Sequence, residues 1–281
     1  MCECADEKTK SIICKSHIRI SAHSHINMKQ IPNIFTLLNL VFGCLAIVAI
    51  LQNGLLLTTS DNGDSLIVLP EKIYLASIFI ACAAVIDFLD GFVARLLKAS
   101  SEMGKQLDSL ADVVSFGVAP GLIIYQFLRL CFAQQEDGLD ISMLWLLPAF
   151  IVPCAGAYRL ARFNIDTEQS YGFKGVPIPA AGLLVASFPL IYWFTSETWI
   201  IQLMHNYWFW YAVIFVVSYL MVSTLPMMAL KFKEPTIKKL MPFIIIAVIA
   251  AATAFIFQWI AVPVTFIAYV ILSLLNKQKQ S

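Results

Sequence analysis

The sequence predicts an all-α fold: a polytopic membrane bundle of about eight transmembrane helices, with both termini in the cytoplasm. Hydrophobic residues make up 59% of the 281 residues and charged residues only 13%, whereas soluble domains carry about 25% charged residues. Long apolar runs follow one another along the chain, and Lys and Arg gather in alternate connections between the runs. These observations exclude a water-soluble domain and predict an integral membrane protein.

Apolar runs long enough to cross a bilayer, which takes about 17 to 25 residues, fill the chain from residue 33 to residue 275. Because the runs are continuously apolar and lack the in-out alternation of a membrane barrel, we expect them to be helical. Only Gln258 and Trp259 separate the last two runs, and Pro263 interrupts the final one. The expected helices are 33–52, 71–97, 108–133, 143–163, 178–196, 207–228, 239–257 and 259–275.

The chain is expected to divide into three parts. We interpret residues 1–30 as a polar leader, either disordered or an over-called start, and expect residues 1–27 to be dispensable. Residues 31–230 are expected to form the functional membrane domain, and residues 231–281 further C-terminal helices with a basic tail. The net charge of +1 gives no reason to expect nucleic acid as a partner.

The distribution of Lys and Arg predicts the orientation, since short cytoplasmic connections are enriched in these residues. Connections 53–70, 134–142 and 197–206 contain acidic residues but no Lys or Arg. Both termini and the remaining connections are therefore expected to face the cytoplasm. Their basic residues include Lys15, Arg19, Lys29, Lys98, Lys105, Lys174, Lys231, Lys233, Lys238, Lys239, Lys277 and Lys279.

Four acids interrupt the second and third apolar runs. Asp87 and Asp90 are three residues apart, and Asp108 and Asp112 are four apart, so each pair falls on one helix face. A charge in the membrane costs roughly 2.5 to 3.5 kcal/mol on insertion scales, and like charges brought together repel each other. A hairpin of the two helices therefore predicts a carboxylate cluster that needs cations, and oxygen ligands favour Mg²⁺ or Mn²⁺. Solvated acids at a helix end, or acids paired with basic neighbours, are the alternative.

Small residues at positions 91, 94 and 104 would let a large ligand approach the backbone, and Arg95 supplies a planar cation suited to a phosphate. The pattern resembles the signature of the CDP-alcohol phosphatidyltransferase family, which places eight fixed residues over these 26 positions. The matching residues are Asp87, Asp90, Gly91, Ala94, Arg95, Gly104, Asp108 and Asp112.

The resemblance implies a pocket that opens to the cytoplasm, two divalent ions held by the four aspartates, and a homodimer. Asp108 and Asp112 would be the catalytic residues, with Asp112 as the base. The start of the first span is also similar to that family, which adds Asn33 and Thr36 to the nucleotide site. The residues implied to bind the CDP group are Asp87, Gly91, Ala94, Arg95, Gly104, Asn33 and Thr36.

Three stretches, 108–120, 156–164 and 173–182, resemble those of bacterial and archaeal phosphatidylserine synthases. This resemblance implies CDP-diacylglycerol as the donor and L-serine as the acceptor of the phosphatidyl group. Arg159 and Arg162 are three apart on one expected helix, and either is suited to grip a carboxylate. Asn164 and Lys174 are further candidates for the acceptor site. The alternative for both arginines is anchoring at the membrane interface.

Two other functions remain open at this stage. One is a different enzyme of the same family, such as a phosphatidylglycerophosphate or phosphatidylinositol-type synthase. The other is a cation transporter that uses the acids as its ion site. Transporters are often built from internal repeats, and the sequence holds no second copy of the aspartate motif.

Overall fold

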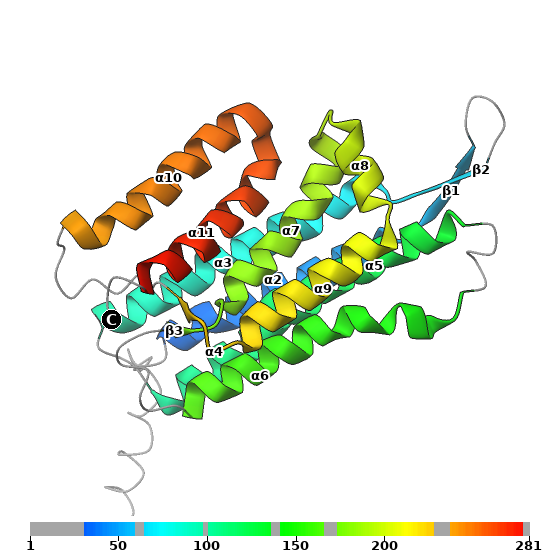
Figure 1. Cartoon of the computed structure of the whole chain (residues 1–281). Helices are drawn as coiled ribbons and strands as arrows, with labels where there is room; N and C mark the ends of the chain where they lie inside the picture. The colour runs from blue at the N-terminus through cyan, green and yellow to red at the C-terminus, as the bar shows by residue number, and fades with distance from the viewer. Residues whose placement is uncertain are drawn as a thin grey trace, which may run out of the picture.

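The computed structural model describes residues 31–59, 65–97, 101–135, 141–165, 173–227 and 237–277, and it confirms a helical bundle (Figure 1). The α-helices are α2 (Ile31–Gln52), α3 (Tyr74–Leu96), α4 (Glu102–Asp112), α5 (Ala119–Ala133), α6 (Ile151–Ile165), α7 (Ile178–Phe194), α8 (Thr198–Met204), α9 (Tyr207–Val222), α10 (Ile237–Phe257) and α11 (Ala261–Lys277). Shorter helical turns are η2 (Glu71–Ile73), η3 (Val113–Val118), η4 (Met143–Trp145), η5 (Leu147–Phe150) and η6 (Gln258–Ile260).

Two short antiparallel strand pairs complete the described part of the chain. One pair joins β1 (Leu56–Thr59) to β2 (Ser65–Val68), with Leu56 opposite Val68. The other joins β3 (Phe173–Lys174) to β4 (Pro226–Met227). The remaining backbone hydrogen bonds lie largely within helices, as a lipid environment requires of membrane-spanning segments.

Each of the eight expected apolar segments contains a helix, but the count of eight membrane spans is not confirmed. Within the described residues, five helical stretches are long and apolar enough to cross a membrane, or six if α8 and α9, bent by 75°, form one span. Helix α7 has 17 residues and falls below that length. Met241–Leu275 counts as one stretch, although Gln258, with φ of 50°, separates α10 from α11.

Helix ends gather in the order that the alternating connections predict. The start of α2 lies at the same end of the bundle as the end of α3, the start of α4 and the ends of α6, α9 and α11 (Figure 1). The β1–β2 pair and α8 lie at the opposite end. The assignment of these two ends to the two sides of a membrane stays a prediction.

A π-helical turn, η3, directly follows Asp112 and joins α4 to the buried helix α5. Ser101 begins α4 as its N-cap, with its side chain accepting a hydrogen bond from the Gly104 amide at 3.0 Å. Helix α2 packs closely on η3: a Cβ at Gly43 would lie 2.9 Å from the Cα of Ser115. Single π turns are frequent at functional sites, and this turn fixes the backbone immediately beyond the acid pair.

An aromatic cluster stabilises the middle of the bundle. The rings of Phe127 in α5 and Trp210 in α9 stack with centroids 4.5 Å apart, and Phe188 of α7 meets Trp210 edge-on at 5.0 Å. The buried indole of Trp210 donates a hydrogen bond to the carbonyl of Met204 at 2.8 Å. These contacts join α5, α7 and α9 into one core, and α3, which carries Asp87 and Asp90, packs against α7.

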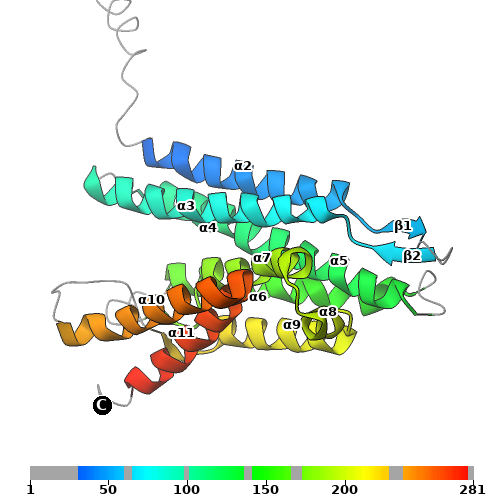
Figure 2. The same ribbon diagram turned by 90° about the horizontal axis from the view of Figure 1, so that it is seen from above.

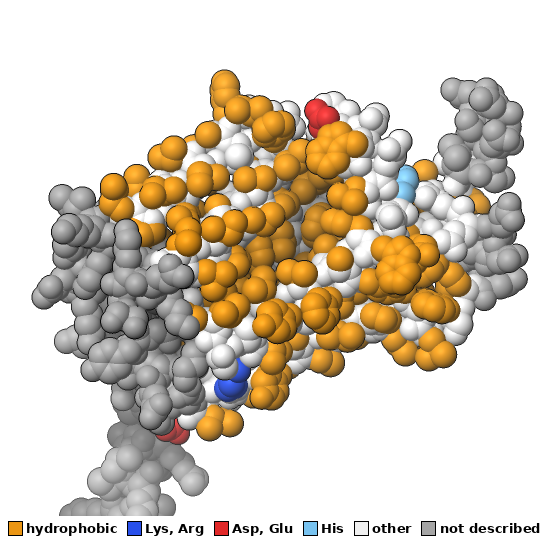
Figure 3. All heavy atoms as spheres, in the orientation of Figure 1, with side chains coloured by type: hydrophobic (Ala, Val, Ile, Leu, Met, Phe, Trp, Pro, Cys, Tyr) orange, Lys and Arg blue, Asp and Glu red, His pale blue; other side chains and the backbone are white. Residues whose placement is uncertain are grey.

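Helices α10 and α11 lie side by side on one flank of the bundle, and α11 packs on α7 and β4 (Figures 1 and 2). Figure 3 shows a face over α7, α9, α10 and α11 that is mainly hydrophobic, with its few charged side chains near the edges. Phe255 is 93% exposed and Phe215 is 70% exposed. Such a surface suits contact with lipid chains, in agreement with an integral membrane protein.

Candidate active site

The acids of α3 and α4 converge, as the sequence predicts. One carboxylate oxygen each from Asp87, Asp90 and Asp108 can be chosen so that all three lie within 4.8 Å of one another. The Asp87 carboxyl also lies within electrostatic reach of Asp112. Asp90 and Asp112 are buried, at 7% and 6% exposure. The convergence of Asp87, Asp90 and Asp108 is therefore confirmed, while the place of Asp112 in the cluster and the chemical roles of all four acids stay predictions.

Helix α2 supplies hydrogen bonds to both acid pairs. The Thr36 hydroxyl donates to Asp90 Oδ2 at 2.8 Å and also contacts the Pro32 carbonyl at 3.2 Å. One turn later, Asn39 Nδ2 donates to Asp112 Oδ1 at 3.2 Å. Thr36 was expected in the site from the sequence, whereas Asn39 was missed. Its signal was the helical spacing from Thr36, which places both side chains on one face of α2.

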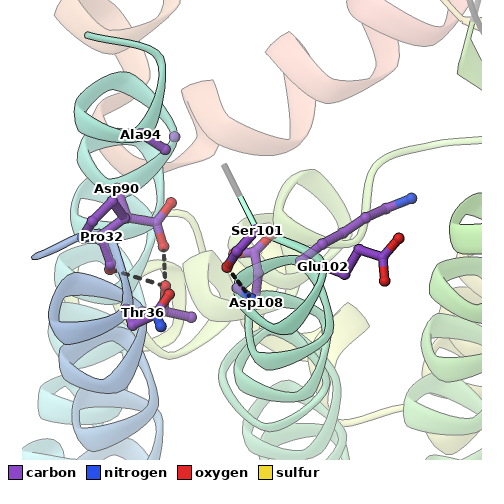
Figure 4. Close-up of a pocket in the computed structure, with 11 residues that line it drawn as sticks. Pro32, Thr36, Asp90, Ala94, Ser101, Glu102 and Asp108 are labelled. Atoms are coloured by element: carbon purple, nitrogen blue, oxygen red, sulfur yellow. Dashed lines mark hydrogen bonds between the residues drawn. The ribbon is translucent and has the colours of Figure 1, made fainter. Parts of the chain in front are cut away.

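A cavity of about 470 Å³ lies beside the acids, between the start of α2, the end of α3 and the start of α4 (Figure 4). In Figure 4, Thr36 and Asp90 point toward each other across α2 and α3, and Asp108 belongs to α4 on the other side of the cavity. The expected nucleotide residues that line it are Asn33, Thr36, Gly91, Ala94 and Gly104. The other lining residues are Pro32, Asp90, Ser101, Glu102, Lys105 and Asp108.

The two signature glycines have different surroundings. A Cβ at Gly104 would lie 3.0 Å from both Asn33 Oδ1 and Ser101 Oγ, so the missing side chain lets α2 and α4 approach. A Cβ at Gly91 would meet no described atom within 4 Å, so this position borders open space in the cavity. Arg95, which is exposed, is not among the described residues that line the cavity.

The predicted acceptor residues fall into separate environments. Arg159 is 5% exposed, and the structure's described residues offer no hydrogen-bond partner to its Nε. Its guanidinium lies within electrostatic reach of Asp112 and of Tyr269 in α11. Arg162 instead donates to the carbonyls of Val222 and Ser223 at 2.8 and 3.0 Å, and so caps the end of α9. The two arginines thus differ in burial and in hydrogen-bond partners, although Arg162 lies within electrostatic reach of Arg159.

Asn164 ties the end of α6 to α4. Its side-chain Nδ2 donates to the Ser109 hydroxyl at 2.8 Å, and its backbone carbonyl accepts from Lys105 Nζ at 3.3 Å. Lys105 also lies 5.7 Å from the centroid of the Phe163 ring. Lys174 belongs to β3, and its side chain lies outside the described part of the chain. Lys105, which sequence reasoning used only for orientation, lines the cavity.

Comparisons with known proteins agree with this geometry. A family model described as CDP-alcohol phosphatidyltransferase matches residues 29–208. A protein of Bacillus subtilis strain 168 is 34% identical over 163 residues, which cover 57% of this chain and 77% of that protein. One of Mycobacterium tuberculosis strain H37Rv is 28% identical over 257 residues, covering 87% and 77%.

A protein of Helicobacter pylori strain J99 is 46% identical over 108 residues, which cover 38% of this chain and 42% of that protein. The match with this relative therefore spans less than half of its length. All three relatives carry the name CDP-diacylglycerol–serine O-phosphatidyltransferase. The family match ends at residue 208, so α10 and α11 lie beyond it.

Proposed function

This chain belongs to the CDP-alcohol phosphatidyltransferase family, and from that premise we propose that it transfers the phosphatidyl group of CDP-diacylglycerol to the hydroxyl of L-serine. The observation that carries the proposal is the convergence of Asp87, Asp90 and Asp108 within 4.8 Å at a cavity of about 470 Å³. The names of the relatives favour serine as the acceptor over glycerol phosphate or inositol phosphate.

The donor set suits a hard divalent cation. Members of the family depend in general on divalent metal ions, and the acid cluster fits one. Oxygen atoms alone make up the cluster, and the buried Oδ1 of Asp108 has no hydrogen-bond partner within the described ranges. We propose that Asp87, Asp90, Asp108 and Asp112 hold two ions, Mg²⁺ or Mn²⁺. When bound, such ions would neutralise the diphosphate and stabilise the departing CMP.

The residues of the chain would then position the donor. Gly91 and Ala94 leave space beside the acids, while Asn33, Thr36 and Gly104 line the same cavity. We assign this cavity to the CDP group, with Asp87 at its acidic side and the exposed Arg95 near the phosphates. Holding the reacting groups in place accounts for much of the rate in phosphoryl transfer.

The transfer step needs a base for the serine hydroxyl. Asp112 is buried at 6% exposure and oriented by Asn39, so one carboxylate oxygen is held while the other can accept the proton. A new bond forms between the serine oxygen and the β-phosphorus, and the bond from that phosphorus to the oxygen of the CMP phosphate breaks. CMP leaves with the electron pair of that bond. Asp108 shares the cluster with Asp112 and completes the catalytic pair.

The acceptor would bind on the α6 side of Asp112. Arg159, buried and with an unpaired Nε among the described residues, is the group best placed to bind the serine carboxylate. Asn164 and Lys174 remain proposed members of this site. Arg162 stays a proposed member as well, although its side chain is engaged with the end of α9.

We further propose that the acid-bearing end of the bundle faces the cytoplasm. This end holds the start of α2 and the end of α11, and the connections assigned to it carry the Lys and Arg residues. A homodimer is proposed from the family resemblance alone. Light scattering of the purified protein in detergent would measure the number of chains in each particle.

The deciding experiment measures CMP release by the purified full chain in detergent micelles with CDP-diacylglycerol and Mn²⁺ or Mg²⁺. L-Serine, glycerol 3-phosphate and inositol phosphate are supplied in parallel. We expect release with serine that stops when EDTA removes the metal. Release with another alcohol only would assign a different enzyme of the family. No release with any alcohol would refute the enzymatic proposal and revive a cation transporter.

A further inference from the structure

Asn39 is a buried polar residue at the centre of the site with no role so far beyond orienting Asp112. It lies in the middle of α2, is 0% exposed, and donates through Nδ2 to Asp112 Oδ1 at 3.2 Å. Its own backbone carbonyl accepts a hydrogen bond from the Ser115 hydroxyl at 3.1 Å. Asn39 is therefore tied to Asp112 through its side chain and to Ser115 through its backbone carbonyl.

The packing around Asn39 leaves it little freedom to move. Ser115 belongs to the π turn that follows Asp112 and is itself 0% exposed. Gly43, one turn further along α2, allows the helix to sit directly against Ser115. A rigid amide next to the proposed base is the arrangement expected of a group that positions another residue.

The Oδ1 atom of Asn39 is buried, and the described portion of the chain provides it with no hydrogen-bond partner. An amide offers two donors and one acceptor oxygen, and an unpaired buried acceptor is costly. A ligand that donates an N–H or O–H group to this oxygen would remove the penalty.

A second unpaired atom of the opposite kind lies near the same aspartate. Nε of Arg159, on α6, is a buried donor without a partner among the described residues, and this side chain is within electrostatic reach of Asp112. Two unpaired atoms therefore lie near Asp112: the acceptor Oδ1 of Asn39 on α2 and the cationic donor Nε of Arg159 on α6. The ligand that complements both carries an N–H group and an anionic group, which describes an α-amino acid.

The geometry points to Asn39 as a residue with two tasks: it positions Asp112 through Nδ2, and it receives the ammonium group of the acceptor amino acid on Oδ1. This inference rests on the proposed function, since it places the serine carboxylate at Arg159 and the serine hydroxyl at Asp112. Asn39 would recognise the amino group of serine. Glycerol phosphate and inositol phosphate have no amino group.

Two substitutions separate the two tasks. Asn39→Asp keeps the size and an acceptor oxygen but replaces the donor by a carboxylate that repels Asp112, so turnover should fall about 10- to 100-fold while KM for serine stays within about threefold. Asn39→Ala removes both groups and should in addition raise KM for serine about 10-fold or more. KM for CDP-diacylglycerol should stay within about twofold in both variants, since the cavity residues are unchanged.

The matched control is Asn53→Ala. Asn53 directly follows the last residue of α2, and its side chain donates to the carbonyl of Ala49 at 2.7 Å, away from the acids. It should keep wild-type kinetics. Thermal unfolding in detergent checks that each Asn39 variant is folded; if Asn39→Ala is not, Asn39→Ser serves in its place.

The outcomes separate this inference from the proposed function. Wild-type kinetics in the Asn39 variants, or an equal rise in KM for both substrates, would overturn the role of Asn39 alone. An Asn39→Asp variant that raises KM for serine as much as Asn39→Ala would overturn the ammonium contact. A wild-type enzyme that uses only glycerol 3-phosphate would refute the proposed function itself.

Discussion

Replacing Thr36 by valine tests whether α2 controls the metal-binding acids. The Thr36 side chain is 3% exposed, and its hydroxyl donates to Asp90 Oδ2 at 2.8 Å. Valine has nearly the same shape, so the substitution removes the hydroxyl and leaves a methyl group in its place. Asp90 would lose a buried hydrogen bond without a large change in packing.

The size of the effect follows from that bond. A hydrogen bond to a charged group contributes about 1.5–3 kcal/mol, and about 1.4 kcal/mol corresponds to a tenfold change in an equilibrium constant. The hydroxyl also contacts the Pro32 carbonyl at 3.2 Å, which competes for its one proton. We therefore expect the lower part of that range, about 10- to 30-fold weaker metal binding, as for other groups that support a metal ligand.

The assay titrates Mn²⁺ against CMP release at saturating CDP-diacylglycerol and serine. Thr36→Val should need about 10- to 30-fold more Mn²⁺ for half-maximal turnover and recover most of the maximal rate. The matched control is Thr253→Val, whose hydroxyl bonds only to its own helix, at Ile249 and Ala250. An unchanged Mn²⁺ requirement in Thr36→Val would refute the claim that the Thr36–Asp90 bond supports the metal site.

Four further substitutions test other parts of the site. Asp112→Asn should lower turnover about 10²- to 10⁴-fold while CDP-diacylglycerol binding persists; wild-type turnover would remove Asp112 as the base. Arg159→Ala and Arg162→Ala should each raise KM for serine more than KM for CDP-diacylglycerol, and Arg162→Ala should also lower the thermal midpoint, because its bonds hold the end of α9. An unchanged serine KM in either variant excludes that arginine from the acceptor site. Gly43→Ala should destabilise the protein by about 1–3 kcal/mol through crowding at Ser115, and an unchanged midpoint in detergent would contradict that packing.

The acid pairs were predictable because charge is rare in lipid-facing sequence. Asp87 and Asp90 stand out within an apolar run, and the helical repeat alone places each pair on one face. A short connection between two helices then brings the faces together. The helical spacing of the acids and the free-energy cost of a charge in the membrane both predict this cluster. The structure confirms it for Asp87, Asp90 and Asp108.

The partners of the acids were harder to predict, because they come from distant parts of the chain. Asn39 and Asp112 are 73 residues apart, and Ser115 is 76 residues from Asn39. Nothing in the local sequence marks the π turn after Asp112 either. Such contacts depend on how α2 sits against η3, which helical periodicity does not specify.

The two arginines show a similar limit. Arg159 and Arg162 share a helix at a spacing that favours one face, yet the first is buried near Asp112 and the second reaches the end of α9. A long side chain spans several ångströms, so its direction decides its contact more than its position does. Spacing alone therefore could not separate an acceptor-site candidate from a helix cap.

Helix α2 has no acidic or basic residue, and yet it determines the geometry of the acid cluster. Thr36 holds an acid from α3, and Asn39 holds one from α4, so a single helix sets the distance between the two pairs. Gly43 continues the same stripe and lets the helix approach the π turn. Because the polar positions repeat at intervals of three and four residues, a displacement of α2 would disturb both pairs at once. Thr36→Val and Asn39→Asp combined should therefore lower turnover by more than either change alone, through a shared loss of alignment.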